Sequence, residues 1–180
     1  MPAHMKDTIA SAFLSMAKRR NVDKITVKDV VEECGISRQT FYYHFQDITD
    51  VIAWSIQNAL QQSLKLSLAA EDSEEALQYF ADSARENRQI IERLLRSRRR
   101  EQVEVMVLDA IRTYLEEMLR HRKPDLSLGG DELDLALRFA TYGVAGILLD
   151  YRTTVEDEEK VIHQLHLLLE GKLFPAETLT

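Results

Sequence analysis

Apolar residues recur at helical spacing along most of the chain, and no stretch alternates apolar and polar residues as a β-strand would. Ile9, Phe13 and Met16 form one face of a first predicted helix, which ends in a basic run at residues 18–20. Further helices are predicted over residues 26–34, 37–45, 47–68, 73–87, 88–97, 99–121, 131–151 and 154–171. The pattern therefore predicts an all-α fold.

The segment 26–45 is predicted to hold two short helices joined by a tight turn. Thr26 and Asp29 stand at the two positions of a capping box, in which each side chain accepts from the other residue's backbone N–H. Gly35 is expected to end the first helix in the left-handed conformation, and Ser37 is expected to cap the second helix. This arrangement is typical of a helix-turn-helix.

The second of these helices carries groups that suit the major groove of DNA. A guanidinium, an amide, hydroxyls and rings are supplied by Arg38, Gln39, Thr40, Tyr42, Tyr43 and His44. Such groups can pair with base edges and with phosphate oxygens. The same spacing also fits a generic helical hairpin whose polar face is only solvated.

The amino-acid sequence of this segment resembles that of a known protein family. Residues 26–34 read TVKDVVEEC and residues 35–45 read GISRQTFYYHF, which is similar to the DNA-binding domain of TetR-family transcriptional regulators. The resemblance implies a helix-turn-helix domain over residues 1–46, here called the head domain, and a helical ligand-binding and dimerisation domain over residues 47–180. It also implies a homodimer on a pseudo-palindromic operator in double-stranded DNA, with repression relieved by a small-molecule effector.

The resemblance suggests which side chains meet DNA. Contacts to base edges are expected from Lys28, Arg38, Gln39 and Tyr42. Contacts to phosphate or sugar are expected from Thr26, Thr40, Tyr43 and His44. TetR-like proteins usually carry a lysine where this chain has Ile48, so we expect Ile48→Lys to strengthen binding and to steepen its dependence on salt.

The charge is unevenly distributed along the chain. The net charge is −7, yet residues 1–50 hold seven basic and seven acidic side chains, so the whole deficit lies in the remaining residues. A segment without net charge, such as residues 1–50, can still hold phosphates through helix N-termini and a few local cations. Weak nonspecific binding to DNA is the expected consequence.

Other compositional features favour a cytoplasmic protein. With 6 glycines and 3 prolines in 180 residues, the chain has few helix breakers. No apolar run approaches the length of a membrane span, and the start of the chain lacks the apolar segment of a secretory signal. Cys34 is the single cysteine, which excludes an intramolecular disulfide, and its place on an apolar face suits packing.

The last two predicted helices are candidates for the dimer contact. The segment 131–151 is apolar nearly all round, which is typical of a helix buried on two sides. A central core helix in a monomer is the alternative. By resemblance, the contact face is expected to comprise Leu137, Ala140, Val144, Leu148, Tyr151, Val161, Leu165, Leu168 and Leu169, with Gly143 and Gly146 permitting close approach.

An effector pocket is expected in the larger domain. Its candidate residues are aromatic or flexible apolar side chains on the middle helices, although core packing also explains each of them. They are Tyr79, Phe80, Met106, Tyr114, Met118, Phe139 and Tyr142.

Several other patterns have simpler explanations. Five arginines between Arg93 and Arg100 fit a solvated helix junction far from the helix-turn-helix, with an anionic ligand or a partner protein as alternatives. His163 and His166 could share a metal, but no cysteine or carboxylate motif supports a metal site. Since no phosphate-binding loop, nucleophile elbow or HExxH sequence occurs, no cofactor is predicted and the chain is not expected to be an enzyme.

A second function is left open by the same resemblance. The stretch ECGISRQTFYYHF is also similar to the branch of the family that activates dihydroxyacetone-kinase operons together with a ligand-carrying partner protein. In that case the unknown effector would be a protein, and the arginine cluster or the acidic surface would be its docking site.

Overall fold

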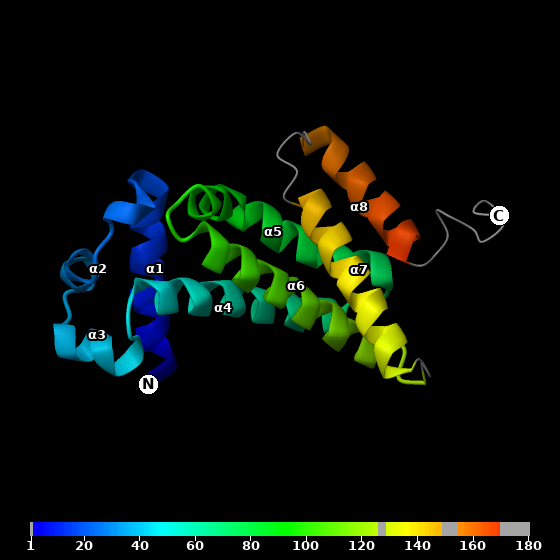
Figure 1. Cartoon of the computed structure of the whole chain (residues 1–180), viewed down its shortest axis with the longest axis horizontal. Coiled ribbons are helices and arrows are strands. Elements are labelled where there is room, and N and C mark those ends of the chain that lie inside the picture. Colours follow the sequence, from blue (N-terminus) through cyan, green and yellow to red (C-terminus); the bar gives the residue numbers. More distant parts are fainter. Residues whose placement is uncertain (1, 126–128, 149–154, 170–180) are drawn as a thin grey trace. The chain divides into compact units, whose positions relative to one another are not determined.

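The computed structural model describes residues 2–125, 129–148 and 155–169, and these ranges are helical almost throughout (Figure 1). The elements in order are α1 (Pro2–Arg19), the short 3-10 helix η1 (Val22–Lys24), α2 (Val27–Cys34), α3 (Arg38–His44), α4 (Ile48–Ala69), α5 (Ser73–Leu95), α6 (Arg100–Arg122), α7 (Gly130–Leu148) and α8 (Val155–Leu169). The described ranges contain no β-strand, which confirms the predicted all-α class.

The helices group into two compact units. The first unit comprises residues 1–59 together with 87–107, and the second comprises residues 60–86 together with 108–180. Each of the helices α4, α5 and α6 therefore runs through both units. The domain boundary after residue 46 stays a prediction.

The core of the first unit forms where α1, α2 and α3 pack together (Figure 1). Ile9, Phe13 and Met16 line the inner face of α1 and are almost completely buried, as their spacing predicts. Phe41 and Phe45 of α3 are buried with them, and their ring centroids lie 6.1 Å apart. These two rings fix the inner side of α3 and leave its other side exposed.

The start of α4 buries the side chain of Ile48. Asp47 Oδ1 accepts from the backbone N–H of Asp50 at 2.9 Å, as expected for a capped helix start. Ile48, the first residue of the helix, is only 4% exposed. Its side chain belongs to the core, so a lysine there would bury a charge instead of reaching phosphate. The burial of Ile48 therefore argues against the expectation that Ile48→Lys strengthens DNA binding, and the effect of the substitution stays a prediction.

The helix α5 differs from the prediction in its continuity and in its cap. It runs unbroken over Ser73–Leu95, where two separate pieces were predicted. No glycine or proline interrupts this stretch, and its apolar residues keep one face from Ala76 to Leu94. The cap is Asp72, whose Oδ1 accepts from the backbone N–H of Glu75 at 2.8 Å, and Ser73 is already helical.

Tyr114 is buried in the core of the second unit and contacts residues of two other helices. Its ring stacks on that of Phe80, with centroids 4.1 Å apart, and its hydroxyl contacts Ser67 Oγ and the carbonyl oxygen of Ala76, both at 2.9 Å. Burial raises the pKa of Tyr114 to about 12. Nearby, the guanidinium of Arg122 donates to the carbonyl oxygens at the end of α4, including that of Ala70 at 2.8 Å. These contacts join α4, α5 and α6 within the unit.

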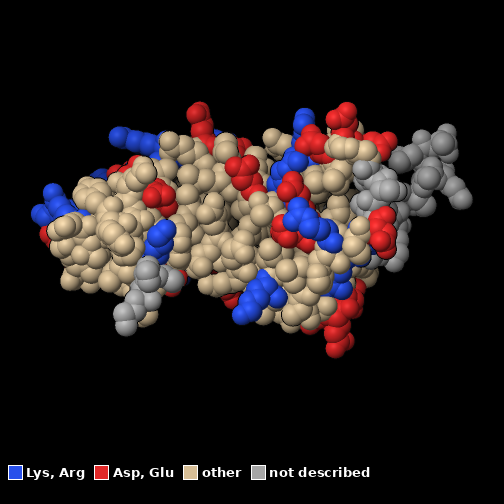
Figure 2. Space-filling model, turned by 90° about the horizontal axis from the view of Figure 1, so that it is seen from below, with Lys and Arg blue, Asp and Glu red and all other residues tan. Residues whose placement is uncertain are grey.

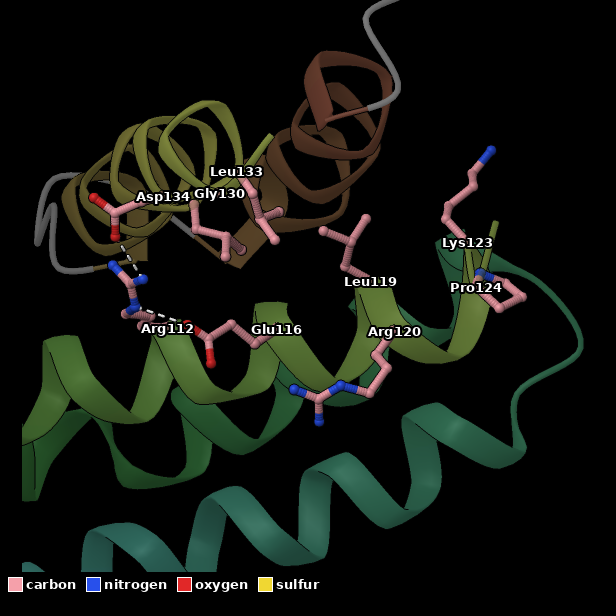
Figure 3. Close-up of a pocket in the computed structure, with 10 residues that line it drawn as sticks. Arg112, Glu116, Leu119, Arg120, Lys123, Pro124, Gly130, Leu133 and Asp134 are labelled. Atoms are coloured by element: carbon pink, nitrogen blue, oxygen red, sulfur yellow. Dashed lines mark hydrogen bonds and ion pairs between the residues drawn. The ribbon is translucent and has the colours of Figure 1, made fainter. Parts of the chain in front are cut away.

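The helices α7 and α8 lie side by side in Figures 1 and 3, and their bounds agree closely with the predicted ones. The predicted capping box that begins at Thr154 lies outside the described residues. None of the helices in the described ranges combines the length and the apolar character needed to cross a membrane.

Candidate nucleic-acid interface

The two helices of the helix-turn-helix begin at the caps that the sequence predicts. Asp29 Oδ2 accepts from the backbone N–H of Thr26 at 2.8 Å, and Thr26 Oγ1 accepts from the backbone N–H of Asp29 at 3.3 Å. Hydrogen bonds from Thr26 lower the pKa of Asp29. Gly35 ends α2 with φ of 64°, a conformation that costs other residues steric strain. Ser37 Oγ then accepts from the backbone N–H of Thr40 at 3.0 Å and starts α3.

The outer face of α3 presents the side chains proposed to meet DNA. Arg38 and Gln39 are exposed at its first turn, and Tyr42 and Tyr43 are 57% and 81% exposed. The half-buried members of the set are Thr40 and His44. Thr26 and Lys28 are exposed at the start of α2. The structure thus leaves most of the predicted contact residues accessible, while their roles toward DNA stay predictions.

Three of the seven cations of the head domain, Arg19, Arg20 and Lys28, lie within 4.0 Å of a carboxylate in the described part of the chain. The ammonium nitrogen of Lys28 lies 3.7 Å from Glu32 Oε1, and a guanidinium nitrogen of Arg20 lies 3.4 Å from Asp29 Oδ1. Such exposed pairs contribute little to stability, and a phosphate can compete with them. Figure 2 views the molecule from below, and there the left-hand end, which holds α1, α2 and α3, shows mostly uncharged residues. A DNA interface at this end of the chain would therefore rely on a few cations and on polar and aromatic groups.

The arginine-rich junction between α5 and α6 is not an isolated solvated turn. Asp23 of η1 accepts from the backbone N–H of Arg98 at 3.1 Å and lies 3.8 Å from the guanidinium of Arg99. Arg99 also donates to the hydroxyl of Thr49 at 3.4 Å. The junction belongs to the same compact unit as the helix-turn-helix. The prediction that it lies far from the helix-turn-helix is wrong, because sequence separation does not report this packing.

The predicted dimer face is largely occupied within the chain itself. Leu137, Val144 and Leu165 are buried, with Val144 only 1% exposed. Ala140 and Leu168 are half-buried. The side chains of Leu148, Tyr151, Val161 and Leu169 lie outside the described residues. For the three buried residues the structure corrects the prediction, since core side chains of one subunit are not available to a second.

The opposite face of α7 is apolar and exposed. Leu135, Phe139 and Tyr142 are 67%, 74% and 62% exposed and follow one another at helical spacing. Gly143 and Gly146 lie on exposed positions of the same helix, and a side chain at either would meet nothing within 4 Å. An apolar stripe of this kind is typical of a contact with another molecule. Leu135, Phe139, Tyr142, Gly143 and Gly146 are called the α7 face below.

The residues predicted to form an effector pocket differ in their burial. Phe80 and Tyr114 pack against each other in the core. Phe139 and Tyr142 belong to the exposed α7 face, where they enclose nothing. The half-buried members of the set are Tyr79, Met106 and Met118, of which Met106 belongs to the first compact unit. The predicted effector pocket stays a prediction.

The structure contains a pocket of about 420 Å³ between α6 and α7, shown in Figure 3. Leu119 and Leu133 point toward each other across it. Its lining consists of Arg112, Glu116, Leu119, Arg120, Lys123, Pro124, Gly130, Leu133, Asp134 and Leu137, none of which was predicted as a pocket residue. The sequence offered only the loop signals of Pro124 and the Gly129-Gly130 pair next to it.

Ion pairs close one side of this pocket. The guanidinium of Arg112 contacts Glu116 on its own helix and Asp134 on α7, each at 2.8 Å, as the dashed lines in Figure 3 mark. Arg138 approaches the other carboxylate oxygen of Asp134 at 2.6 Å. Hydrogen bonds from Arg112 and then from Arg138 lower the pKa of Asp134. Any molecule entering here would meet apolar walls beside a paired charge cluster.

The histidines of α8 do not form a metal cluster in the described part of the chain. His163 Nδ1 lies 2.7 Å from Glu74 Oε1, which links α8 to α5. Across the described ranges, no group of three or more His, Cys, Asp or Glu side chains is arranged to hold a metal ion. Cys34, the single cysteine, is half-buried, and burial raises the pKa of its thiol.

Comparisons with known proteins agree with this architecture. Residues 9–53 match the family described as "Bacterial regulatory proteins, tetR family", and residues 71–171 match the family described as "Transcriptional regulator C-terminal region". The second match alone spans more than half of the chain. The chain belongs to the TetR family of transcriptional regulators, as the sequence of residues 26–45 indicated. Neither of the two matching families is described as an enzyme family.

A curated protein that is similar to part of this chain is a transcriptional activator. The HTH-type dhaKLM operon transcriptional activator DhaS of Lactococcus lactis subsp. lactis (strain IL1403) is 34% identical over 50 residues, which are 28% of this chain and 27% of the relative. The match thus spans only about a quarter of that relative's length.

Two solved structures share the fold over nearly the whole chain. The dihydroxyacetone kinase operon activator DhaS superposes with a TM-score of 0.67 and 19% identity, covering 93% of this chain and 95% of that one. A protein assigned to the TetR-family transcriptional regulators from Syntrophomonas wolfei str. Goettingen gives a TM-score of 0.61 and 15% identity, covering 97% of this chain and 100% of that one. At these identities the likeness shows the fold alone.

Proposed function

We propose that this TetR-family regulator binds a pseudo-palindromic operator as a homodimer and responds to an effector bound in its second unit. The observation that carries the proposal is the outer face of α3. It exposes Arg38, Gln39, Tyr42 and Tyr43 on a helix held from behind by buried Phe41. A short helix fixed at both ends and polar on its outer side fits the major groove, where base edges offer a distinct pattern of donors and acceptors.

The proposed chemistry follows from the side chains. The guanidinium of Arg38 can donate two hydrogen bonds to one guanine, and the amide of Gln39 can pair with one adenine. Both residues stand in the first turn of α3, the part of a recognition helix that usually meets base edges. Tyr42 and Tyr43 can contact thymine methyl groups with their rings and backbone phosphates with their hydroxyls.

The symmetry of the proposed complex requires a dimer, and we place the contact on the α7 face. Two copies that share this face would cover three large apolar side chains on each subunit, Leu135, Phe139 and Tyr142. The exposed glycines Gly143 and Gly146 would allow the two helices to approach closely. The dimer then holds two heads at the separation that successive major grooves require.

The proposed response to an effector uses helices that run through both compact units. The pocket between α6 and α7 lies in the second unit, whereas the start of α6 belongs to the first unit together with the helix-turn-helix. A ligand that favours one arrangement of α6 can therefore change the separation of the heads and lower operator affinity. Repression relieved by the ligand is the expected outcome.

Selection of bound sequences from random duplex DNA tests this function. We expect enrichment of a two-fold symmetric motif whose half-sites lie one or more helical turns apart. Arg38→Ala is the matched variant, because it keeps the cap at Ser37 and the buried face of α3. It should lose preference at one or two positions in each half-site. Failure of the wild-type protein to enrich any motif would contradict the proposal.

The similarity to DhaS supports a second candidate, an activator that acts through a partner protein. The experiment that distinguishes the two candidates is native mass spectrometry of the protein purified from its own cells, followed by identification of any bound protein or small molecule. A stoichiometric protein that dissociates only on denaturation would favour the activator. A bound small molecule displaced by competition would favour the ligand-responsive repressor.

A further inference from the structure

Among the described cations of the head domain, Lys6 differs in that its ammonium group contacts an aromatic ring. Lys6 Nζ lies 5.4 Å from the centroid of the Phe45 ring, the distance of a cation–π contact. Among the described residues, no carboxylate lies within 4.0 Å of it, whereas Lys28, Arg19 and Arg20 each approach a carboxylate. The charge of Lys6 is therefore held in position without being neutralised.

The position of Lys6 relates directly to α3. Phe45 is the C-cap of that helix. Its ring is buried on the inner side of α3, and the ammonium of Lys6 lies over this ring, beside the C-terminal end of the helix that is proposed to enter the groove. The 7 residues of α3 span about 10 Å, close to the groove width of about 12 Å. Groups at the ends of such a helix lie near the phosphates that border the groove. Arg38 supplies a cation at the N-terminal end of α3.

We propose that Lys6 is a phosphate contact at the C-terminal end of α3, oriented in advance by the ring of Phe45. This inference rests on the proposed DNA-binding function and adds a residue of α1 to the interface. A cation that is already ordered loses less side-chain entropy on binding than a free lysine does. Because the formal charges of residues 1–50 cancel, one such contact is a large share of the nonspecific attraction.

Titration of DNA binding against salt tests the proposal. Each phosphate contact adds about 0.9 to the slope of log affinity against log salt, so two heads contribute about 1.8. Lys6→Met keeps the apolar stem of the side chain and removes its charge. On a random-sequence duplex, the slope of Lys6→Met should be lower by about that amount, and Lys6→Arg should restore it. The bases preferred in a selection should not change, because phosphate contacts carry no sequence information.

Lys18→Met is the matched control. Lys18 is exposed on the same helix, but it stands twelve positions away, about 18 Å along the axis, and should leave the slope unchanged. A Lys6→Met protein that is folded by circular dichroism and keeps the wild-type slope would overturn the proposal, even if it melts at a lower temperature. A wild-type protein that binds no duplex would instead overturn the proposed DNA-binding function.

Discussion

Replacing Phe139 by aspartate should separate the proposed dimer without unfolding the subunit. Phe139 is 74% exposed on the α7 face, so the change removes no contact from the core. An aromatic side chain carries about 150–250 Å² of surface, so a dimer contact that covers the exposed part would bury on the order of 110–190 Å² of Phe139. At about 25 cal/mol per Å², this burial contributes about 3–5 kcal/mol per subunit.

The symmetry of the dimer doubles this loss. If the contact covers the whole exposed part of both rings, two copies of the substitution should weaken association by about 6 kcal/mol, or on the order of 10⁴-fold in the dissociation constant. The unpaired carboxylates add a desolvation cost if the contact stays closed. Analytical ultracentrifugation at micromolar protein should therefore show a wild-type dimer and a Phe139→Asp monomer with the same helical content by circular dichroism.

Two control variants make this result specific. Leu66→Asp places the same charge on an exposed apolar residue of α4, outside the α7 face, and should leave the dimer intact. Val144→Asp, on the buried side of the same helix, should cost several kcal/mol of folding stability and yield unfolded protein rather than folded monomer. A folded Phe139→Asp protein that remains dimeric would refute the assignment of the α7 face.

The remaining predictions concern stability. Since the pKa of Tyr114 is raised to about 12, its neutral form supplies stability that is complete below pH 10 and is lost as the pH rises toward 12. Urea unfolding at pH 9 and at pH 11 should show a loss of stability at the higher pH in the wild type. About 1.3 kcal/mol of this loss should be absent in Tyr114→Phe, and equal losses in both proteins would assign the effect to other groups. Gly35→Ala should cost about 1–2 kcal/mol at the positive φ, and a neutral result in thermal melts would mean that the turn relaxes. Ile48→Lys should lower the melting temperature and weaken DNA binding with it, whereas tighter binding would show that this position reaches phosphate.

The helix ends of the helix-turn-helix were predictable from the sequence because hydrogen bonds between residues close in the chain determine them. Thr26, Ser37 and Gly35 fix the helix ends of the helix-turn-helix through contacts within three residues, and the structure has the same caps. The fold class follows from apolar periodicity that is uninterrupted over long stretches. The predicted break in α5 near residue 87 was wrong because no glycine or proline occurs there.

Features set by packing between distant helices were not predictable in the same way. The helix α7 is apolar on both sides, so its pattern does not show that Val144 turns inward and Phe139 outward. The contact of Asp23 with Arg98 joins residues 75 positions apart, and no local sequence motif predicts it. Likewise, the pocket between α6 and α7 is lined by charged and aliphatic residues, whereas aromatic composition pointed to the core pair Phe80 and Tyr114.

The affinity of the protein for a selected duplex and for a scrambled duplex of the same composition tests sequence-specific binding by α3 most directly. The wild type should prefer the selected duplex by about 10³-fold or more at physiological salt. Tyr42→Ala should lose about 1–3 kcal/mol on the selected duplex and little on the scrambled one, with unchanged helical content. Equal affinity of the wild type for both duplexes, or an unchanged preference in Tyr42→Ala, would contradict base reading by this face of α3.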